Sequence, residues 1–176
     1  MEEKYSVTVR GISPLLSNRM DIEPIKKKKK AGEGYDNQGD AEKALYKDDG
    51  VICQPSIHFE AAMVKAASNY KIPGAGKKTY KDAFKGGIII NPLMIPHKIP
   101  IWKLDLQSVV VGRARIIRAR PRFDSWELDF EITNIDERIL QDVIKDCLVD
   151  AGKFVGIGDY RPKFGRFEVI KFEKIR

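Results

Sequence analysis

Two amphipathic segments, with strand-like segments before and after each, constrain most strongly what this chain can fold into. The first predicted helix follows an N-cap at Ser56, and the second covers about residues 137–151, between an N-cap at Asp136 and a stop at Gly152. In both, apolar residues recur three and four positions apart, so each helix is expected to bury one face against a sheet. The first stripe consists of Phe59, Ala62, Met63, Ala66, Ala67 and Tyr70. The second consists of Leu140, Val143, Ile144, Cys147, Leu148 and Ala151.

Alternating segments supply the sheet. Tyr5, Val7 and Val9 share one face of a first strand over residues 4–10, and a last strand begins near Phe167. Residues 113–123 and 126–133 also alternate, and they are joined at residues 124 and 125, which predicts a hairpin. Opposite charges face each other in this pairing, so it would neutralise much of an arginine run. The facing pairs are Arg118 with Glu131, Arg120 with Asp129, and Arg122 with Glu127.

With its irregular segments set aside, the chain reads strand, helix, strand, strand, helix, strand. That order is typical of the ferredoxin-like fold, in which two helices pack on one face of an antiparallel sheet. We therefore predict an α+β fold, with one ferredoxin-like (βαββαβ) domain over residues 1–176, an ordinary length for a single domain. Two long loop insertions are expected at about 12–50 and 71–100.

Composition favours a polyanionic partner. The net charge is +7, and the excess of cations lies in residues 51–100, with +5, and in residues 151–176, with +4. No apolar run approaches the ~20 residues of a membrane span and the first residues do not form a signal peptide, so we expect a cytoplasmic protein without a membrane partner. Cys53 and Cys147 lack the spacing of a zinc site and are expected to be buried free thiols. We expect no metal and no cofactor.

Residues 155–169 mix glycines, cations and aromatic residues between the second helix and the last strand. This mixture suits a single nucleic-acid strand, because glycines let a phosphate backbone approach, cations bind phosphates and aromatic rings stack on bases. The same glycines also fit a helix C-cap followed by a plain connection, and the sequence leaves both readings open. The order helix, loop, strand excludes a dinucleotide-binding fingerprint. The candidate contact residues are Gly156, Gly158, Tyr160, Arg161, Lys163, Phe164, Gly165 and Arg166.

Three further basic groups are candidates for nucleic-acid contact. The group in the second insertion comprises Lys71, Lys77, Lys78, Tyr80, Lys81 and Lys85. Arg113 and Arg115 lack an acidic partner in the predicted hairpin. Lys26, Lys28 and Lys30 belong to a run of five lysines, which would attract phosphates without discriminating between sequences. Both lysine groups also fit a solvated loop without a ligand.

These features resemble the RAMP superfamily, the repeat-associated proteins of CRISPR systems. The motifs Gly156-Ile-Gly158 and Lys163-Phe-Gly165-Arg166 are similar to the glycine-rich loop that this family places between its second helix and last strand. Residues 51–63 (Val-Ile-Cys-Gln-Pro-Ser-Ile-His-Phe-Glu-Ala-Ala-Met) are similar to the family's strand-to-helix signature, but lack its glycine and second serine. Residues 159–162 (Asp-Tyr-Arg-Pro) depart from the CRISPR proteins and resemble the ending of uncharacterised phage proteins.

The resemblance implies a non-catalytic protein that binds single-stranded RNA, or single-stranded DNA, and self-associates along the strand as a backbone subunit. It also implies that the insertion at 12–50 forms a thumb. In this function, Arg161, Lys163 and Arg166 would hold phosphates, which the backbone N–H groups of Gly156 and Gly158 would approach. Either of the aromatic residues, Tyr160 or Phe164, would stack on bases.

A metal-independent endoribonuclease related to the CRISPR processing enzymes is the catalytic alternative. Those enzymes often place a histidine near the start of the first helix, where His58 lies. Cleavage needs a general base, a general acid and a cation for the phosphorane. The candidates are His58, Lys65, and Tyr70 or Tyr160. Some backbone subunits instead cut RNA with a thumb carboxylate, for which the candidates are Asp21, Asp36 and Asp40.

A phage assembly or host-interference factor is the third possibility, because long insertions and sheet edges also bind proteins. Salt separates the classes, since phosphate-driven binding weakens steeply as salt rises and an apolar interface persists.

Overall fold

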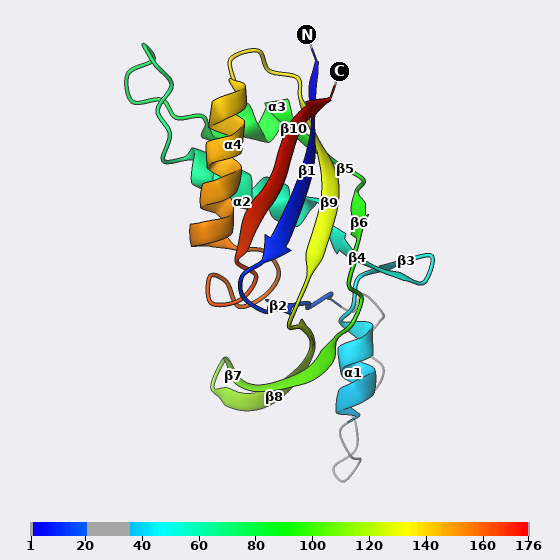
Figure 1. Ribbon diagram of the computed structural model, residues 1–176. Coiled ribbons are helices and arrows are strands. Elements are labelled where there is room, and N and C mark those ends of the chain that lie inside the picture. Colours follow the sequence, from blue (N-terminus) through cyan, green and yellow to red (C-terminus); the bar gives the residue numbers. More distant parts are fainter. Residues whose placement is uncertain (1, 21–35, 176) are drawn as a thin grey trace.

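The computed structural model describes residues 2–20 and 36–175 (Figure 1). Its main sheet has four antiparallel strands in the order β10–β1–β9–β5. These strands are β1 (Glu3–Gly11), β5 (Ile88–Asn91), β9 (Glu127–Asn134) and β10 (Phe167–Ile175). Helices α2 (Ile57–Ala67) and α4 (Gln141–Asp150) pack together on one face of this sheet (Figure 1). The prediction of an α+β fold with an antiparallel sheet is therefore confirmed.

The core lies between this sheet and the two helices. Tyr5, Val7 and Val9 of β1 are at most 1% exposed, as their alternation predicted. Phe59 of α2 lies 4.7 Å from the Phe130 ring of β9, between ring centroids. The other predicted apolar positions of α2 up to Ala67 are also buried, and burial of each large side chain contributes about 1.5–3 kcal/mol. Both cysteines, Cys53 and Cys147, are free and buried, as predicted.

Helix α4 begins later than the sequence predicted. Asp136 does not cap it, because the Asp136 carboxylate accepts from the backbone N–H of Arg138 in a turn, while Asn134 bonds to both Asp136 and Ile139. Leu140, expected in the buried stripe, is 64% exposed in front of the first helical turn. At its other end α4 continues into one π-helical turn, η1 (Ala151–Val155), which ends when Gly156 N–H donates to Ala151 O.

The predicted hairpin between residues 113–123 and 126–133 is wrong. Strand β8 (Ala114–Phe123) pairs with β7 (Lys103–Val111), and β9 pairs with β1 and β5. An alternating strand fits any partner with the same period, so the pattern did not determine the pairing. Trp126 decides it: its ring is buried against Gly11 and its indole N–H donates to Ser13 O, which directs the following residues into the main sheet.

The arginine run consequently has other partners than those predicted. Arg120 pairs with Asp159, and Arg122 pairs with Asp124 and Asp105. Arg118 has no ion pair with any residue in 2–20 or 36–175.

The second insertion is more regular than expected. Residues 71–100 contain α3 (Lys81–Gly87), the core strand β5 and the short strand β6 (Met94–Pro96). Strand β5 supplies Ile88 and Ile90 to the core. Strand β6 pairs with β4 (Val51–Pro55), which also pairs with β3 (Lys47–Asp48).

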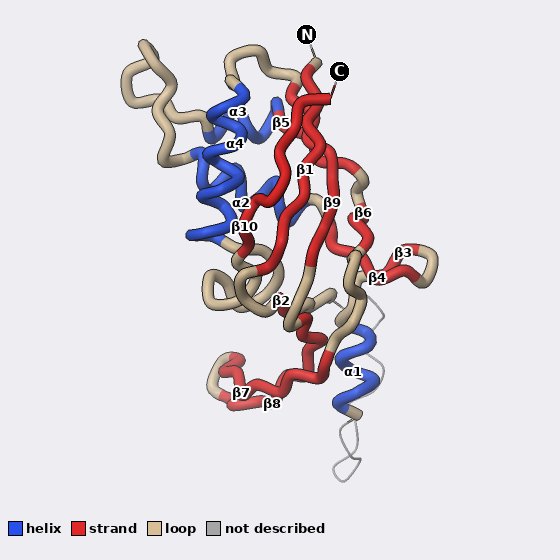
Figure 2. Tube along the Cα trace, viewed as in Figure 1, coloured by secondary structure: helices blue, strands red, loops and turns tan. Residues whose placement is uncertain are grey.

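A second lobe lies at the end of the molecule opposite the two termini (Figure 2). It consists of the β7–β8 hairpin, the two-residue strand β2 (Leu15–Leu16) beside β8, and helix α1 (Asn37–Lys43), which packs against β8. Strand β2 and α1 both come from the first insertion. The candidate residues Lys26, Lys28, Lys30 and Asp21 lie outside the described residues.

Candidate nucleic-acid interface

The glycine-rich loop, residues 156–166, packs on itself and on residues 13–17. Gly156, Gly158 and Gly165 all have φ between 73° and 76°, where glycine is favoured. A Cβ on Gly158 would collide with Leu15 and Leu16, and one on Gly165 would collide with Ile157 O. The N–H groups of Gly156 and Gly165 donate to Ala151 O and Pro14 O, both at 2.8 Å. The prediction that Gly156 offers its N–H to a phosphate is therefore wrong: these glycines shape the loop.

The cations of this loop remain available to a ligand. Arg161, Lys163 and Arg166 are exposed, and none forms an ion pair with a described residue. Tyr160 is 50% exposed, whereas Phe164 is only 9% exposed and packs against the Tyr160 ring at 5.8 Å. Of the two predicted stacking residues, Tyr160 can therefore meet a base and Phe164 supports it.

One exposed aromatic residue beside the loop was missed by the sequence analysis. Phe154, in η1, is 69% exposed and lies two residues before Gly156. Its signal was present in the sequence, because the buried stripe of this helix continues from Ala151 to Val155 and leaves Phe154 outside it.

An ion pair between the buried Arg120 and the partly exposed Asp159 joins the loop to the second lobe. Arg120 Nε lies 2.9 Å from Asp159 Oδ2, and the Arg120 side chain is 6% exposed. Asp159 N–H also donates to Leu16 O of β2 at 2.9 Å. Asp159 thus holds the cationic loop against the paired strands β2 and β8, through its side chain to Arg120 and through its backbone N–H to Leu16.

His58 lies in the first turn of α2, close to the same loop. Its Nδ1 accepts from the Gln54 amide at 2.5 Å, and the Tyr46 ring meets the imidazole edge-on at 5.4 Å. Burial, and secondarily the Arg161 charge, lower the pKa of His58 below its usual value, so the ring is neutral near pH 7.

The predicted partners of His58 in catalysis do not all lie near it. Lys65 follows His58 by seven helical residues, a rise of about 10 Å. The Tyr70 hydroxyl donates to Asp150 at 2.6 Å beyond the far end of α2, and burial with this bond raises the Tyr70 pKa. Asp36 caps α1 by accepting from Gly39 N–H, and Asp40 lies on α1 in the second lobe. The structure does not bring Lys65 or Tyr70 to His58.

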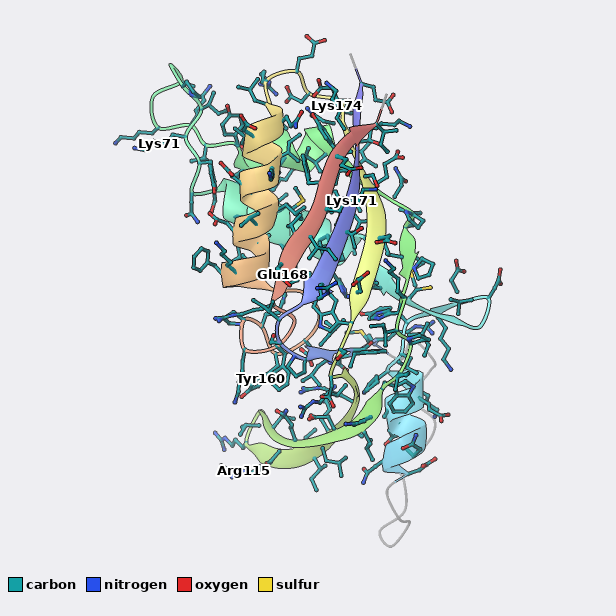
Figure 3. The ribbon with its side chains drawn as sticks, viewed as in Figure 1. Lys71, Arg115, Tyr160, Glu168, Lys171 and Lys174 are labelled. Carbon is teal, nitrogen blue, oxygen red and sulfur yellow. The ribbon has the colours of Figure 1, made fainter. Side chains whose placement is uncertain are left out.

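The other predicted contact residues form separate surfaces (Figure 3). Lys71 lies at the end of the molecule opposite Tyr160 and Arg115. Within the Lys71 group, Tyr80 is 4% exposed and packs on Phe84, so it offers no ring to a base. Lys77, Lys78 and Lys81 are exposed, and Lys85 lies 3.9 Å from Asp82. Arg113 and Arg115 are exposed at the tip of the β7–β8 hairpin.

The sheet face opposite the helices is covered by ion pairs rather than free cations. Lys98 bonds Glu127 at 2.6 Å, Lys4 lies 3.5 Å from Glu131, and Lys171 lies 3.3 Å from Glu173. Five carboxylates share this face with these lysines and Arg10. Among the described residues, the glycine-rich loop therefore offers cations without acidic partners, whereas the cations of the open sheet face are paired.

Two further features limit the chemistry. Among residues 2–20 and 36–175, no group of three or more His, Cys, Asp or Glu side chains is placed to hold a metal ion. In the same residues, no helix has the length and apolar character needed to cross a membrane.

No protein-family model matches this chain, and no curated protein matches it. One solved chain has a similar fold, and this protein spans about 61% of that chain's length. Its fold is similar, with a TM-score of 0.65 over 99% of this chain and 11% sequence identity, to a chain in the cryo-electron microscopy structure of a type III-B Cmr-beta bound to cognate target RNA.

Proposed function

We propose that this chain is a RAMP-type, ferredoxin-like domain that binds single-stranded RNA without cutting it. The strand order β10–β1–β9–β5 supports the βαββαβ arrangement, because α2 joins β1 to β5 and α4 joins β9 to β10. The similar chain comes from an assembly described as bound to its target RNA, which supports RNA as the ligand class. A single domain with a thumb-like first insertion, self-association along the strand and a cytoplasmic location belong to the same proposal.

The observation that carries the proposal is the surface of the glycine-rich loop. Arg161, Lys163 and Arg166 are exposed without acidic partners among the described residues, while the backbone beneath them is fixed by hydrogen bonds to residues 12–16. The exposed rings of Tyr160 and Phe154 lie in and beside this loop. Phosphates can bind the cations while bases stack on the rings, in a manner that tolerates many sequences.

The test is a salt-titrated binding measurement with labelled single-stranded RNA, with single-stranded and duplex DNA as comparison. The double variant in which Arg161 and Lys163 are each replaced by Glu should bind RNA at least ~10-fold more weakly, and its binding should depend less on salt. The matched control is Lys47→Glu with Lys145→Glu, which makes the same change in net charge at two exposed positions away from the loop.

Each result has a defined meaning. If the wild-type chain binds no RNA at low salt, the proposal fails and a protein partner becomes the leading possibility. If the control pair weakens binding as much as the loop pair, the loop is not the site. Recovery of shortened RNA, abolished by His58→Ala, would establish the endoribonuclease instead.

A further inference from the structure

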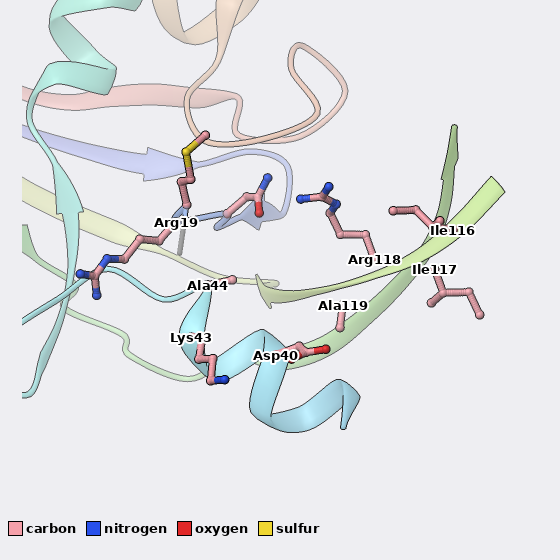
Figure 4. Close-up of a pocket in the computed structure, with 10 residues that line it drawn as sticks. Arg19, Asp40, Lys43, Ala44, Ile116, Ile117, Arg118 and Ala119 are labelled. Atoms are coloured by element: carbon pink, nitrogen blue, oxygen red, sulfur yellow. The ribbon is translucent and has the colours of Figure 1, made fainter. Parts of the chain in front are cut away.

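The second lobe contains a pocket that none of the proposed RNA contacts uses. It has a volume of about 410 Å³ and lies between α1, residues 18–20 and β8 (Figure 4). This volume is within the usual range for small-molecule sites. We propose that the pocket binds one guanine nucleotide of the RNA strand, an inference that rests on the proposed function and adds a base preference to it.

The pocket exists because β2 is short. β2 pairs only Leu15 and Leu16 with β8, and Ser17 N–H then donates to Pro121 O. Beyond this point the edge of β8 has no strand beside it. Because backbone groups alternate along a strand, the N–H and C=O groups of Ile117 and Ala119 point to the same edge as Pro121 O. Both residues line the pocket, and no described strand pairs with them at that edge.

The side chains around this edge combine charge with apolar surface. Figure 4 shows the Asp40 carboxylate directed from α1 toward Ala119 of β8, and the Arg118 guanidinium projecting from the opposite face of the same strand; both residues line the pocket. Lys43 lies one turn after Asp40. Neither Asp40, Lys43 nor Arg118 forms an ion pair with any of the described residues. Separated, unpaired charges of both signs suit a ligand that carries an anionic group and hydrogen-bond donors.

The apolar part of the wall suits a flat ring. Ile116 is 40% exposed and Ile117 is 65% exposed, although both belong to a strand. As neighbours in β8 they point to opposite faces, so a flat ring can cover Ile117, which shares its face with Ala119 beside Asp40. Covering exposed apolar surface is favourable, and a nucleobase has two apolar faces with polar groups confined to its edge. A nucleotide therefore fits the three kinds of surface present: a base against Ile117, an edge toward Asp40, and a phosphate toward Lys43 and, around the free edge of β8, toward Arg118.

The carboxylate selects among the bases. An ionised carboxylate has two acceptor oxygens and no donor. Guanine presents two adjacent donors on its pairing edge, N1–H and the N2 amino group, so both carboxylate oxygens can accept at once. Adenine and cytosine place an acceptor beside their amino group, and uracil places a carbonyl on each side of its N–H. For each of these three bases, Asp40 would oppose a lone pair, so guanine is the base that Asp40 favours.

The position of the pocket connects it to the RNA surface. Arg118 and Arg120 are two residues apart in β8 and therefore share one face of the strand. Arg120 pairs with Asp159, the neighbour of Tyr160 and Arg161 in the glycine-rich loop. An RNA strand that crosses the loop can thus deliver one nucleotide to the pocket along β8.

The experiment measures binding of GMP, AMP, CMP and UMP to the full chain by calorimetry. GMP should bind about tenfold more tightly than the other three, and Asp40→Asn should abolish that difference, because an amide offers one acceptor and one donor. The matched control is Asp82→Asn, an exposed carboxylate in the first turn of α3, and it should leave the preference intact. Arg118→Gln should weaken GMP binding several-fold while leaving binding of guanosine, which lacks the phosphate, unchanged.

The outcomes separate this inference from the proposed function. Equal affinities for the four nucleotides, or a GMP preference that survives Asp40→Asn, would overturn the guanine pocket. If RNA binding still depends on Arg161 and Lys163 in that case, the proposed function is unaffected. A parallel titration with RNA oligomers that contain one guanine or none should show the same preference, and the same loss in Asp40→Asn.

Discussion

Glycines with positive φ occur both in the glycine-rich loop and in exposed turns, and their surroundings differ. Gly165 and Gly74 have φ of 76° and 74°, but a Cβ on Gly165 would collide with Ile157 O and one on Gly74 would meet nothing within 4 Å. Gly74→Ala should therefore cost about 1 kcal/mol, from φ alone. Gly165→Ala should cost about 3 kcal/mol or more, because the loop backbone must also move.

Urea unfolding of the two variants beside the wild type measures this difference. Equal losses for Gly165→Ala and Gly74→Ala would show that the loop relaxes around a methyl group and does not need its glycine for packing.

Aromatic residues show at this scale what the sequence could predict about the site. The sequence marked residues 156–166 as candidate contact residues, and in the structure the cations and Tyr160 of this segment are exposed. It did not distinguish Tyr160 from Phe164 or Tyr80, because an irregular loop has no periodicity from which burial can be inferred. Phe154 differs from these loop residues, because it lies on a helical turn. Extending the buried stripe of that helix would have predicted its exposure.

At the scale of elements, the β7–β8 hairpin depends on its junction with the glycine-rich loop. A two-stranded hairpin is marginally stable alone, and this one is fixed partly by the ion pair between the buried Arg120 and Asp159. Arg120→Met should therefore lower the free energy of unfolding by about 1–2 kcal/mol, because it leaves the Asp159 carboxylate, which is 32% exposed, without its cation. Lys103→Met, which breaks an exposed pair with Asp124 in the same hairpin, should leave stability nearly unchanged.

Combining Arg120→Met with Asp159→Leu tests the cause. If the missing charge partner is responsible, the double variant should recover most of the stability that Arg120→Met loses, since neither charge is then buried alone. Urea unfolding of the four proteins in this cycle measures the coupling, and a purely additive result would assign the loss to packing of the Arg120 stem.

The same hairpin marks the limit of prediction for elements. Strand β1 and helix α2 followed from local periodicity, because each has one buried face that its own residues define. The partner of β8 did not, because Asp105 and Asp159 are as acceptable opposite an arginine as Glu127 or Asp129. Choosing among these partners requires knowing where Trp126 packs. Its contact with Gly11 joins residues 115 positions apart, which local periodicity cannot predict.

At the scale of the whole molecule, the charged side chains that form ion pairs and the exposed cations without ion pairs lie on different surfaces. Ion pairs cover the open sheet face, and the exposed cations of the glycine-rich loop, the hairpin tip and residues 71–81 form no ion pair with a described residue. The net charge of +7 is therefore a property of the edges and insertions. It favours association with a polyanion without requiring the core to hold any charge.

The junction between the two lobes gives the whole molecule a specific sensitivity to acid. His97 is 6% exposed, its ring stacks on Phe123 of β8 at 4.5 Å, and it forms an isolated bridge to Leu128 of β9. Neither ring nitrogen has a hydrogen-bond partner among the described residues. Burial lowers the pKa of His97 from 6.5 to about 4. Because the unfolded chain takes up this proton at higher pH than the folded chain, protons favour unfolding between these two values.

This single group should therefore remove about 3 kcal/mol of stability as the pH falls from about 6.5 to about 4. His97→Phe keeps a ring on Phe123 and removes the titration, so its free energy of unfolding should decline less over that range. Urea unfolding of both proteins at about pH 7 and about pH 4 measures the change, and carboxylates common to the two chains cancel in the difference. A difference between wild type and His97→Phe that is the same at both pH values would mean that His97 does not couple protonation to unfolding at this junction.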